Sequence, residues 1–529
     1  MIAGHPVLTE AKRALDQGRQ EEAARLVVAH LRERPGEPRG LALLGAIAMK
    51  SGALLQAENF LRRAIAGGAD DEDVLRNLAT CVNLQERPAE ALTLLNALIA
   101  AGSDDPEIRA TIAFLHDKLG QGDVARTMWQ GLVEAYPEKP VYWVSLGSNL
   151  RAAGWTDEAL QAYRRAIAAE ADYGDAWWAI ASMRKTELDD AEMSALQQAL
   201  AMAVDVANIS PLHFALGRAW HLAKRYDQAF IHYSEANRVW AEAIGYNADE
   251  LTEEVAEAAH AFGPSAFAAL PAAGEPAPAP LFIVSLPRSG STLLEQMLGS
   301  HADIEPLGEL PYIPALVRGV LEQATQRGRA TIPQAIAALS PAQRQDLGEE
   351  YLRRAALHRR SDARYFVDKL PHNWNNLIFI RHILPNAKFI DIRRDPITCC
   401  FANFSHSFTR AHSSSFALEH IGRAYVDYVR MMDHLDVAAP GLVHRVRYEA
   451  LVDAPETELR AALNYLGLPW DASCLRFYEA QRAVRTPSAE QVRRPLNKEG
   501  IGTWKPYGQW LGPLFDVLRP VLDEPVSTA

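Results

Sequence analysis

The 529-residue chain has few cysteines and no long apolar run. Its four cysteines form no CxxC pair, which argues against a disulfide framework and against a zinc site: Cys81, Cys399, Cys400 and Cys474. No segment approaches the ~20 apolar residues that a membrane-spanning helix needs. The first residues, MIAGHPVLTEAKRALDQ, lack the basic and apolar regions of a signal peptide. We therefore expect a reduced, cytoplasmic protein without a membrane span.

The chain also lacks an excess of positive charge, its net charge being −12. Residues 1–280 carry 25 Lys and Arg against 39 Asp and Glu, whereas residues 281–529 carry 29 against 27. The acidic first half argues against nucleic-acid binding by that half. The near-neutral second half is compatible with a focused basic pocket.

Small residues recur in the first half with a period of 34. Alanines occupy one phase of this repeat: Ala23, Ala57, Ala91, Ala125 and Ala159. Twelve residues before each stands another small residue: Ala11, Gly45, Ala79, Ala113 and Gly147. This pattern resembles the tetratricopeptide repeat (TPR) family of stacked helix pairs. The phase slips near 169–208, where we expect an irregular repeat, and a closing repeat follows at 209–245.

The family resemblance implies that the concave surface of the repeats receives an acceptor protein or peptide. Residues 264–280, PSAFAALPAAGEPAPAP, favour an extended connection because Ala and Pro alternate. We therefore assign residues 1–263 to an all-α repeat solenoid, 264–280 to a linker and 281–529 to a second domain.

The second domain alternates apolar strands with helix-period stretches. Four strands are expected, at 281–286, 365–370, 388–394 and 444–451. The intervening helices are expected at 292–299, 341–358, 373–384 and 416–435. This alternation predicts an α/β domain with a mostly parallel sheet covered on both faces. Such sheets bind ligands at the carboxyl ends of their strands.

The first of these strands runs into a turn-rich loop and a helix, LFIVSLPRSGSTLLEQML at 281–298. Gly290 permits an unusual backbone torsion, and the amides that follow it favour a phosphate or sulfate. Hydroxyls at Ser289, Ser291 and Thr292 and the guanidinium of Arg288 add donors. The Walker pattern GxxxxGK[ST] is absent, which disfavours a P-loop kinase or NTP hydrolase.

The segment PRSGSTLLEQML resembles the 5′-phosphosulfate loop of sulfotransferases, which use 3′-phosphoadenosine 5′-phosphosulfate (PAPS). The resemblance extends over about 281–520 and implies that this loop binds the donor. AKFIDIRRDP is similar to the second signature of the family and places Arg394 at the 3′-phosphate. The resemblance also implies donor contacts from Tyr448 in RYEAL and from Arg494 in RTPSAEQVRRPLN.

Within that family the chain is most similar to the tyrosylprotein branch, and repeats fused to such a domain are familiar among bacterial sulfotransferases. SHADIEPLGELPYIP implies that Glu309 is the catalytic base, and VDKLPHN implies that Lys369 assists the leaving group. Arg288 and Ser488 complete the implied catalytic set. The scheme requires no metal. Structural alternatives are a helix-start carboxylate for Glu309 and a simple salt bridge for Lys369.

Three positions depart from that branch. Ala402 stands where the family usually has Ser, His406 where the branch has Arg, and Thr503 where it has Lys, although Lys505 is near. We expect a weakened or redistributed 3′-phosphate site, with Ser405 and Ser407 as candidate substitutes.

Several functional alternatives stay open at this point. Histidines are rival bases, because other sulfotransferase branches use His: His301, His372, His406 and His412. A tyrosine in a peptide is the expected acceptor, with a carbohydrate or lipid hydroxyl as the alternative. A repeat scaffold with an inactive transferase-like domain is the non-enzymatic alternative. The acceptor and the oligomeric state do not follow from the sequence.

Overall fold

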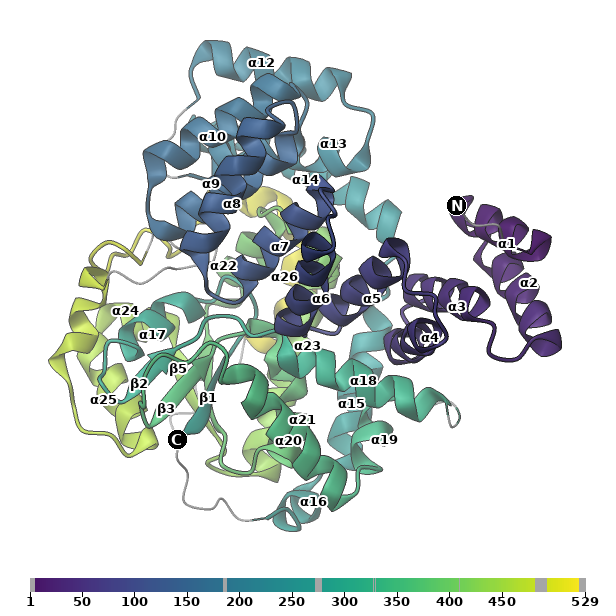
Figure 1. Ribbon diagram of the computed structural model, residues 1–529. Coiled ribbons are helices and arrows are strands. Elements are labelled where there is room, and N and C mark those ends of the chain that lie inside the picture. Colours follow the sequence, from purple (N-terminus) through teal and green to yellow (C-terminus); the bar gives the residue numbers. More distant parts are fainter. Residues whose placement is uncertain are drawn as a thin grey trace. The chain divides into compact units, whose positions relative to one another are not determined.

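The architecture is that of a computed structural model, shown in Figure 1. It describes residues 5–183, 188–271, 278–326, 328, 330–408, 410–480 and 492–522. The chain divides into two compact units. The first comprises Met1–Glu134 with Pro314–Ala330, and the second comprises Ala135–Ile313 with Thr331–Ala529.

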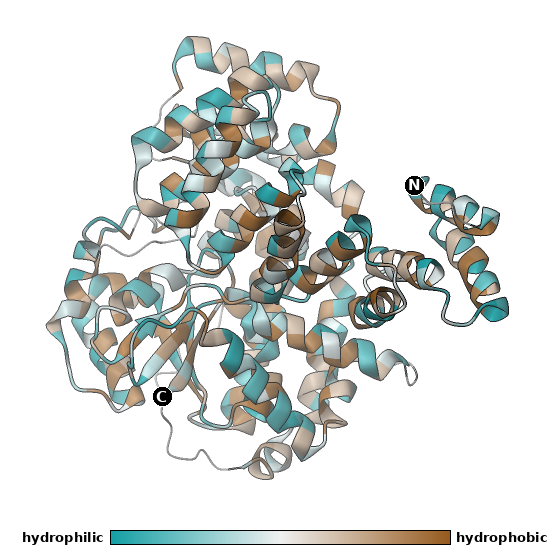
Figure 2. Ribbon diagram, viewed as in Figure 1, coloured by the Kyte–Doolittle hydropathy of each residue, from teal (hydrophilic) through white to brown (hydrophobic). Residues whose placement is uncertain are grey.

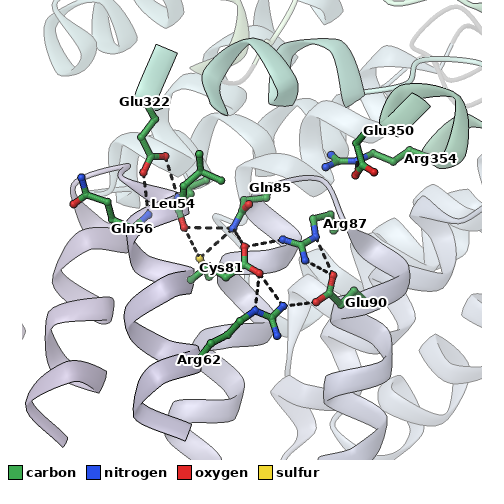
Figure 3. A network of polar contacts seen from close by, with 12 residues as sticks. Leu54, Gln56, Arg62, Cys81, Gln85, Arg87, Glu90, Glu322, Glu350 and Arg354 are labelled. Carbon is green, nitrogen blue, oxygen red and sulfur yellow. Dashed lines mark hydrogen bonds and ion pairs between the residues drawn. The ribbon is translucent and has the colours of Figure 1, made fainter. Parts of the chain in front are cut away.

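The first unit is built from helices in sequential pairs. Their bounds are α1 (Pro6–Asp16), α2 (Gln20–Glu33), α3 (Pro38–Lys50), α4 (Leu54–Ala66), α5 (Glu72–Leu84), α6 (Pro88–Ala100), α7 (Pro106–Lys118) and α8 (Gly122–Ala135). Most of helix α18 (Tyr312–Gln326) belongs to this unit as well. The Glu322 carboxylate of α18 accepts hydrogen bonds from the backbone amides of Leu55 and Gln56 at the start of α4, each with 3.0 Å between nitrogen and oxygen (Figure 3). A carboxylate at a helix N-terminus satisfies amides that have no partner within the helix.

The repeat positions explain how closely the paired helices approach. A Cβ added to Gly45 would lie 2.7 Å from Leu61 Cγ, and one added to Gly147 would lie 2.5 Å from Tyr163 Cε1. Gly217 stands in the same relation to Tyr233, at 2.6 Å. Only a residue without a side chain fits these contacts. The predicted helical-repeat solenoid is therefore confirmed.

The second unit begins with helices of its own. Its helices are α9 (Pro140–Ala153), α10 (Thr156–Ala169), α11 (Gly174–Ser182), α12 (Asp190–Met202), α13 (Val206–Leu222), α14 (Tyr226–Ile244), α15 (Ala248–Ala261) and α16 (Pro264–Ala268). Helix α11 has only nine residues, in the stretch where the sequence period slips. Helix α16 occupies the start of the segment expected to be extended, because Pro264 suits the first turn of a helix.

A five-stranded sheet follows, in the order β2-β3-β1-β4-β5, and all its pairings are parallel. The strands are β1 (Ala279–Val284), β2 (Ile304–Pro306), β3 (Tyr365–Asp368), β4 (Lys388–Arg393) and β5 (Val443–Arg447). Four of them coincide with the predicted strands to within a few residues. The sequence analysis missed β2, because three residues carry no alternation to detect.

Helices cover both faces of this sheet, as predicted, and its strands are hydrophobic (Figure 2). One face packs on α17 (Ser291–Leu298) and α25 (Pro455–Leu466). On the other face Phe282 of β1 contacts Tyr351 of α20 (Pro341–Ala355). There Tyr428 of α23 (Leu418–Ala438) donates to Asp391 of β4. Within the described ranges, no helix is long and apolar enough to cross a membrane.

The remaining described elements lie between the strands of this sheet or after the last of them. They are α19 (Ile332–Ala337), η1 (Pro371–Asn376), α21 (Leu377–Ile383), α22 (Pro396–Phe404), η2 (Arg410–Phe416), α24 (Tyr448–Asp453), η3 (Ala472–Glu479), η4 (Lys505–Trp510) and α26 (Gly512–Leu522). Strand β1 lies between β3 and β4. The strands that follow it in sequence, β2 and β3, therefore lie on one side of it, and β4 and β5 lie on the other. In open α/β sheets the crevice at such a switch point receives the ligand.

Candidate active site at the carboxyl edge of the sheet

The loop after β1 has an unusual backbone. Gly290 has φ +98°, and Arg288, a residue with a side chain, has φ +66°. Left-handed torsion at a non-glycine residue costs free energy and concentrates at functional sites. Helix α17 begins at Ser291, so its first amides lie at the end of this loop. Ser291 and Thr292 are buried in that first turn.

Helix α22 holds the loop in place. Asn403 donates from Nδ2 to the Pro287 carbonyl at 2.7 Å and to the Cys399 carbonyl at 2.8 Å. Ser289 Oγ lies 3.2 Å from Cys399 Sγ. Ser289 and Cys399 are both buried, so these contacts hold the loop on the side that faces the protein interior.

Arg394, at the end of β4, reaches across to the same loop. Its Nη1 donates to the Arg288 carbonyl at 2.6 Å, and its Nη2 donates to the Gly500 carbonyl. Its guanidinium lies 4.8 Å from the centre of the Tyr448 ring. Its Nε is buried and hydrogen-bonds to none of the described residues. An oriented cation with a spare donor suits an anionic ligand.

Tyr448 packs directly on the loop. A Cβ added to Gly290 would lie 2.4 Å from Tyr448 Cδ2, so this position has no room for a side chain. The Tyr448 hydroxyl also packs against Gly500, because a Cβ added to Gly500 would lie 2.9 Å from the hydroxyl oxygen. The structure therefore brings the loop at Arg288, Arg394 and Tyr448 together.

Lys369 and Glu309 form an ion pair beside this loop. Lys369 Nζ lies 2.5 Å from Glu309 Oε1. The Lys369 side chain is 1% exposed and the Glu309 side chain 42% exposed. A buried ammonium needs a partner, and this carboxylate provides one while it also faces solvent. The salt-bridge alternative for Lys369 thus describes its contact with the candidate base itself.

Three side chains that the sequence analysis passed over position this pair. The amide of Gly308 donates to Glu295 Oε1 at 2.9 Å, and the amide of Leu310 donates to Asp368 Oδ1 at 3.4 Å. Tyr351 donates to Asp368 Oδ2 at 3.0 Å. Burial raises the pKa of Asp368 to about 8. The signal for Asp368 was an acid inside an otherwise apolar strand, YFVDKL.

The four rival histidines occupy different settings. His301 is buried, and its Nδ1 accepts the Asp303 amide at 3.0 Å, which is a structural role. His372 and His412 face each other with 3.4 Å between Nε2 and Nδ1. Burial lowers the pKa of His372 to about 3 and also lowers that of His412, while the charge of Glu309 opposes the shift at His412. The carboxylate of Glu309 thus acts electrostatically on His412 of this pair.

Two of the three departures from the family pattern, Ala402 and His406, lie around the end of α22. Ser405 Oγ donates to the Phe401 carbonyl at 2.8 Å, so this hydroxyl is already engaged in its own helix. The His406 ring lies 5.2 Å from the Trp178 ring, edge to face. Trp178, on α11, is half-buried and contacts the segment that follows α22.

The C-terminal candidates are only partly covered by the described residues. Ser488 lies outside them, and Arg494 is half-buried just after that gap. Trp504 stacks edge to face on Phe515 at 5.6 Å, and Lys505 lies against Gly502.

Comparisons with known proteins match part of the chain to one family. Residues 280–472 match the sequence model of the sulfotransferase family. An uncharacterised protein of Aquifex aeolicus strain VF5 is 31% identical over 311 residues, covering 58% of this chain and 41% of that protein. The protein-tyrosine sulfotransferase 1 of Danio rerio is 27% identical over 236 residues, covering 42% of this chain and 65% of that protein. The chain thus spans less than two thirds of the length of either relative.

Among solved structures, YrrB, a TPR protein with an unusual peptide-binding site, is 19% identical with a TM-score of 0.30, over 33% of this chain and 90% of that one. MamA is 19% identical with a TM-score of 0.28, over 30% of this chain and 94% of that one. The domain at residues 280–472, which contains the loop, Arg394 and the Lys369–Glu309 pair, is a sulfotransferase-family domain.

Proposed function

We propose that the protein is a PAPS-dependent sulfotransferase that transfers a sulfuryl group to a hydroxyl acceptor. The loop at 286–292 binds the 5′-phosphosulfate through its amides and Arg288, and Arg394 and Tyr448 bind the rest of the nucleotide. The observation that carries the proposal is the meeting of this loop with the Lys369–Glu309 pair at one edge of the sheet.

The loop has the features that such a donor requires. No side chain fits at Gly290, and the buried Nε of Arg394 has a hydrogen bond to offer. PAPS supplies an activated sulfuryl group when bound. The acceptor oxygen forms a bond to sulfur while the bond from sulfur to the 5′-phosphate oxygen breaks, leaving a sulfate ester and 3′,5′-ADP.

Each member of the ion pair has a role in this exchange. Glu309 takes the proton of the acceptor hydroxyl, since its carboxylate is the solvent-facing member of the pair. Lys369 places a positive charge where negative charge builds on the leaving oxygen. Both residues come from segments fixed by backbone hydrogen bonds, including that from the Lys369 amide to the Gly308 carbonyl at 2.8 Å.

We further propose a tyrosine in a protein or peptide as the acceptor, recruited by the helical repeats. The Glu309 and Lys369 positions and the similarity to protein-tyrosine sulfotransferase 1 support this choice. Incubation with ³⁵S-labelled PAPS and separate peptide, glycan and lipid fractions tests it. Label confined to tyrosine O-sulfate supports it, label in glycan or lipid redirects the acceptor class, and donor binding without label in any fraction favours the scaffold.

A further inference from the structure

The repeat helices of the second unit contact the loop that follows α22. Trp178 of α11 lies against His406, with 5.2 Å between ring centres. Ser182, one turn further along α11, accepts a hydrogen bond from Arg151 Nη1 of α9 at 3.1 Å. Arg151, Trp178, Ser182 and His406 thus form one group, which we call the repeat–loop cluster.

Positive charge converges on this cluster. Burial lowers the pKa of His406 well below its usual value, and the charges of Arg288, Arg151 and Arg218 lower it further. His406 is therefore uncharged at neutral pH. Arg151 of α9, Arg218 of α13 and Arg288 of the loop after β1 thus all act electrostatically on one neutral ring. Guanidinium groups that share a partly buried region attract an anion to it.

The cluster connects to the nucleotide side of the site. Arg493 donates from Nη2 to the Ala152 carbonyl of α9, next to Arg151, at 3.0 Å. The segment that begins there leads to Gly500, whose carbonyl accepts from Arg394. A phosphate of the nucleotide is therefore the anion that this arrangement favours, in preference to a carboxylate of the acceptor beside Glu309.

We infer that Arg151 binds the 3′-phosphate of the donor nucleotide, so that the helical repeats form part of the donor site. Arg218 adds to the attraction at longer range. The inference rests on the proposed function. The similar branch of the family has an arginine at position 406, whereas this chain has an uncharged histidine there, and Arg151 would supply the missing positive charge. The repeats then act on the donor as well as on the acceptor.

The test compares two nucleotides that differ only in the 3′-phosphate. Calorimetry or ligand competition on the full-length chain measures the Kd of 3′,5′-ADP and of 5′-AMP. Arg151→Gln removes the charge and keeps a donor for Ser182. We expect it to weaken 3′,5′-ADP binding roughly tenfold, as for one charge-assisted hydrogen bond, and to leave 5′-AMP binding unchanged. Arg164→Gln, at an exposed arginine of α10 that pairs with Glu192, is the matched control.

A second variant separates charge from structure. His406→Arg in the Arg151→Gln background returns a cation to the cluster, and we expect it to restore the preference for 3′,5′-ADP. If Arg151→Gln leaves that preference unchanged, or weakens both nucleotides equally, the inference is wrong. A failure of the proposed function looks different, because the unmodified protein would then bind neither 3′,5′-ADP nor PAPS.

Discussion

Lys369 and Glu309 meet at 2.5 Å, the lysine buried and the glutamate half open to solvent. The pair lies where β3 ends and where the chain returns after β2. It joins two segments that are 60 residues apart in sequence. Their separate roles in the proposed reaction lead to different expectations for the two residues.

Glu309→Gln keeps a side chain of the same shape beside Lys369 and removes the base. We expect the rate of sulfuryl transfer to fall by about 10²–10⁴ while 3′,5′-ADP binding is retained. Glu349→Gln, at an exposed glutamate of α20, is the control and should leave the rate unchanged. Near-normal transfer by folded Glu309→Gln would remove this residue from the role of base and return the half-buried His372–His412 pair to consideration.

Lys369→Met replaces the buried ammonium with an apolar chain of similar length. We expect kcat to fall by roughly 10²–10³, because charge on the leaving oxygen loses its partner. The thermal unfolding temperature should stay the same or rise, since Glu309 is solvated and a buried charge is removed. Lys388→Met, at the start of β4, is the matched control. Turnover that survives Lys369→Met would leave the salt bridge as the sole role of this lysine.

Gly290→Ala tests how closely the loop at 286–292 packs on Tyr448. The added Cβ would lie 2.4 Å from Tyr448 Cδ2 at a left-handed φ, so the loop or the ring must move. We expect 3′,5′-ADP binding to weaken by about tenfold or more. Gly441→Ala also has a left-handed φ but meets nothing within 4 Å, so it reports the backbone strain alone, about 1–2 kcal/mol. Equal behaviour of the two variants in nucleotide binding would count against close packing at Gly290.

Asp368 should make stability depend on pH. Its pKa is about 8 in the folded protein because of burial, whereas an unfolded aspartate has a pKa near 3.9. Between these values the folded state holds a proton that the unfolded state has lost. The contribution of Asp368 to the free energy of unfolding is therefore fully present below about pH 4. This contribution is lost as pH rises toward 8, at up to about 1.4 kcal/mol per pH unit.

Asp368→Asn removes this titration while its amide oxygen still accepts from Leu310. Denaturant unfolding of both proteins at a series of pH values between 5 and 8 measures the difference. We expect the stability of the variant relative to the original protein to increase with pH. Parallel curves for the two proteins would show that Asp368 is ionised in the fold.

Much of this architecture could be predicted from local pattern. The 34-residue phase identified the repeats because each small residue faces a large one, as Gly147 faces Tyr163. The strands followed from apolar runs, and the loop from its glycine and hydroxyl residues. Arg288 and Arg394 were singled out because each follows an apolar strand, and their part in donor binding stays a prediction.

Long-range contacts were not predictable in this way. Nothing in the sequence around Trp178 indicates that it packs on His406, 228 positions later, because the same aromatic residue suits a repeat core. The support of Glu309 by Asp368 and Glu295 depends on where a three-residue strand returns. Such contacts arise from tertiary packing, which local periodicity does not encode.

The central claim is that the loop at 286–292 binds a 3′-phosphorylated, sulfated nucleotide. Calorimetric titration of the full-length protein with 3′,5′-ADP, and separately with ATP, tests it most directly. The account predicts saturable binding of 3′,5′-ADP that Arg288→Ala abolishes, with much weaker binding of ATP. The absence of 3′,5′-ADP binding, or an equal affinity for ATP, would contradict it.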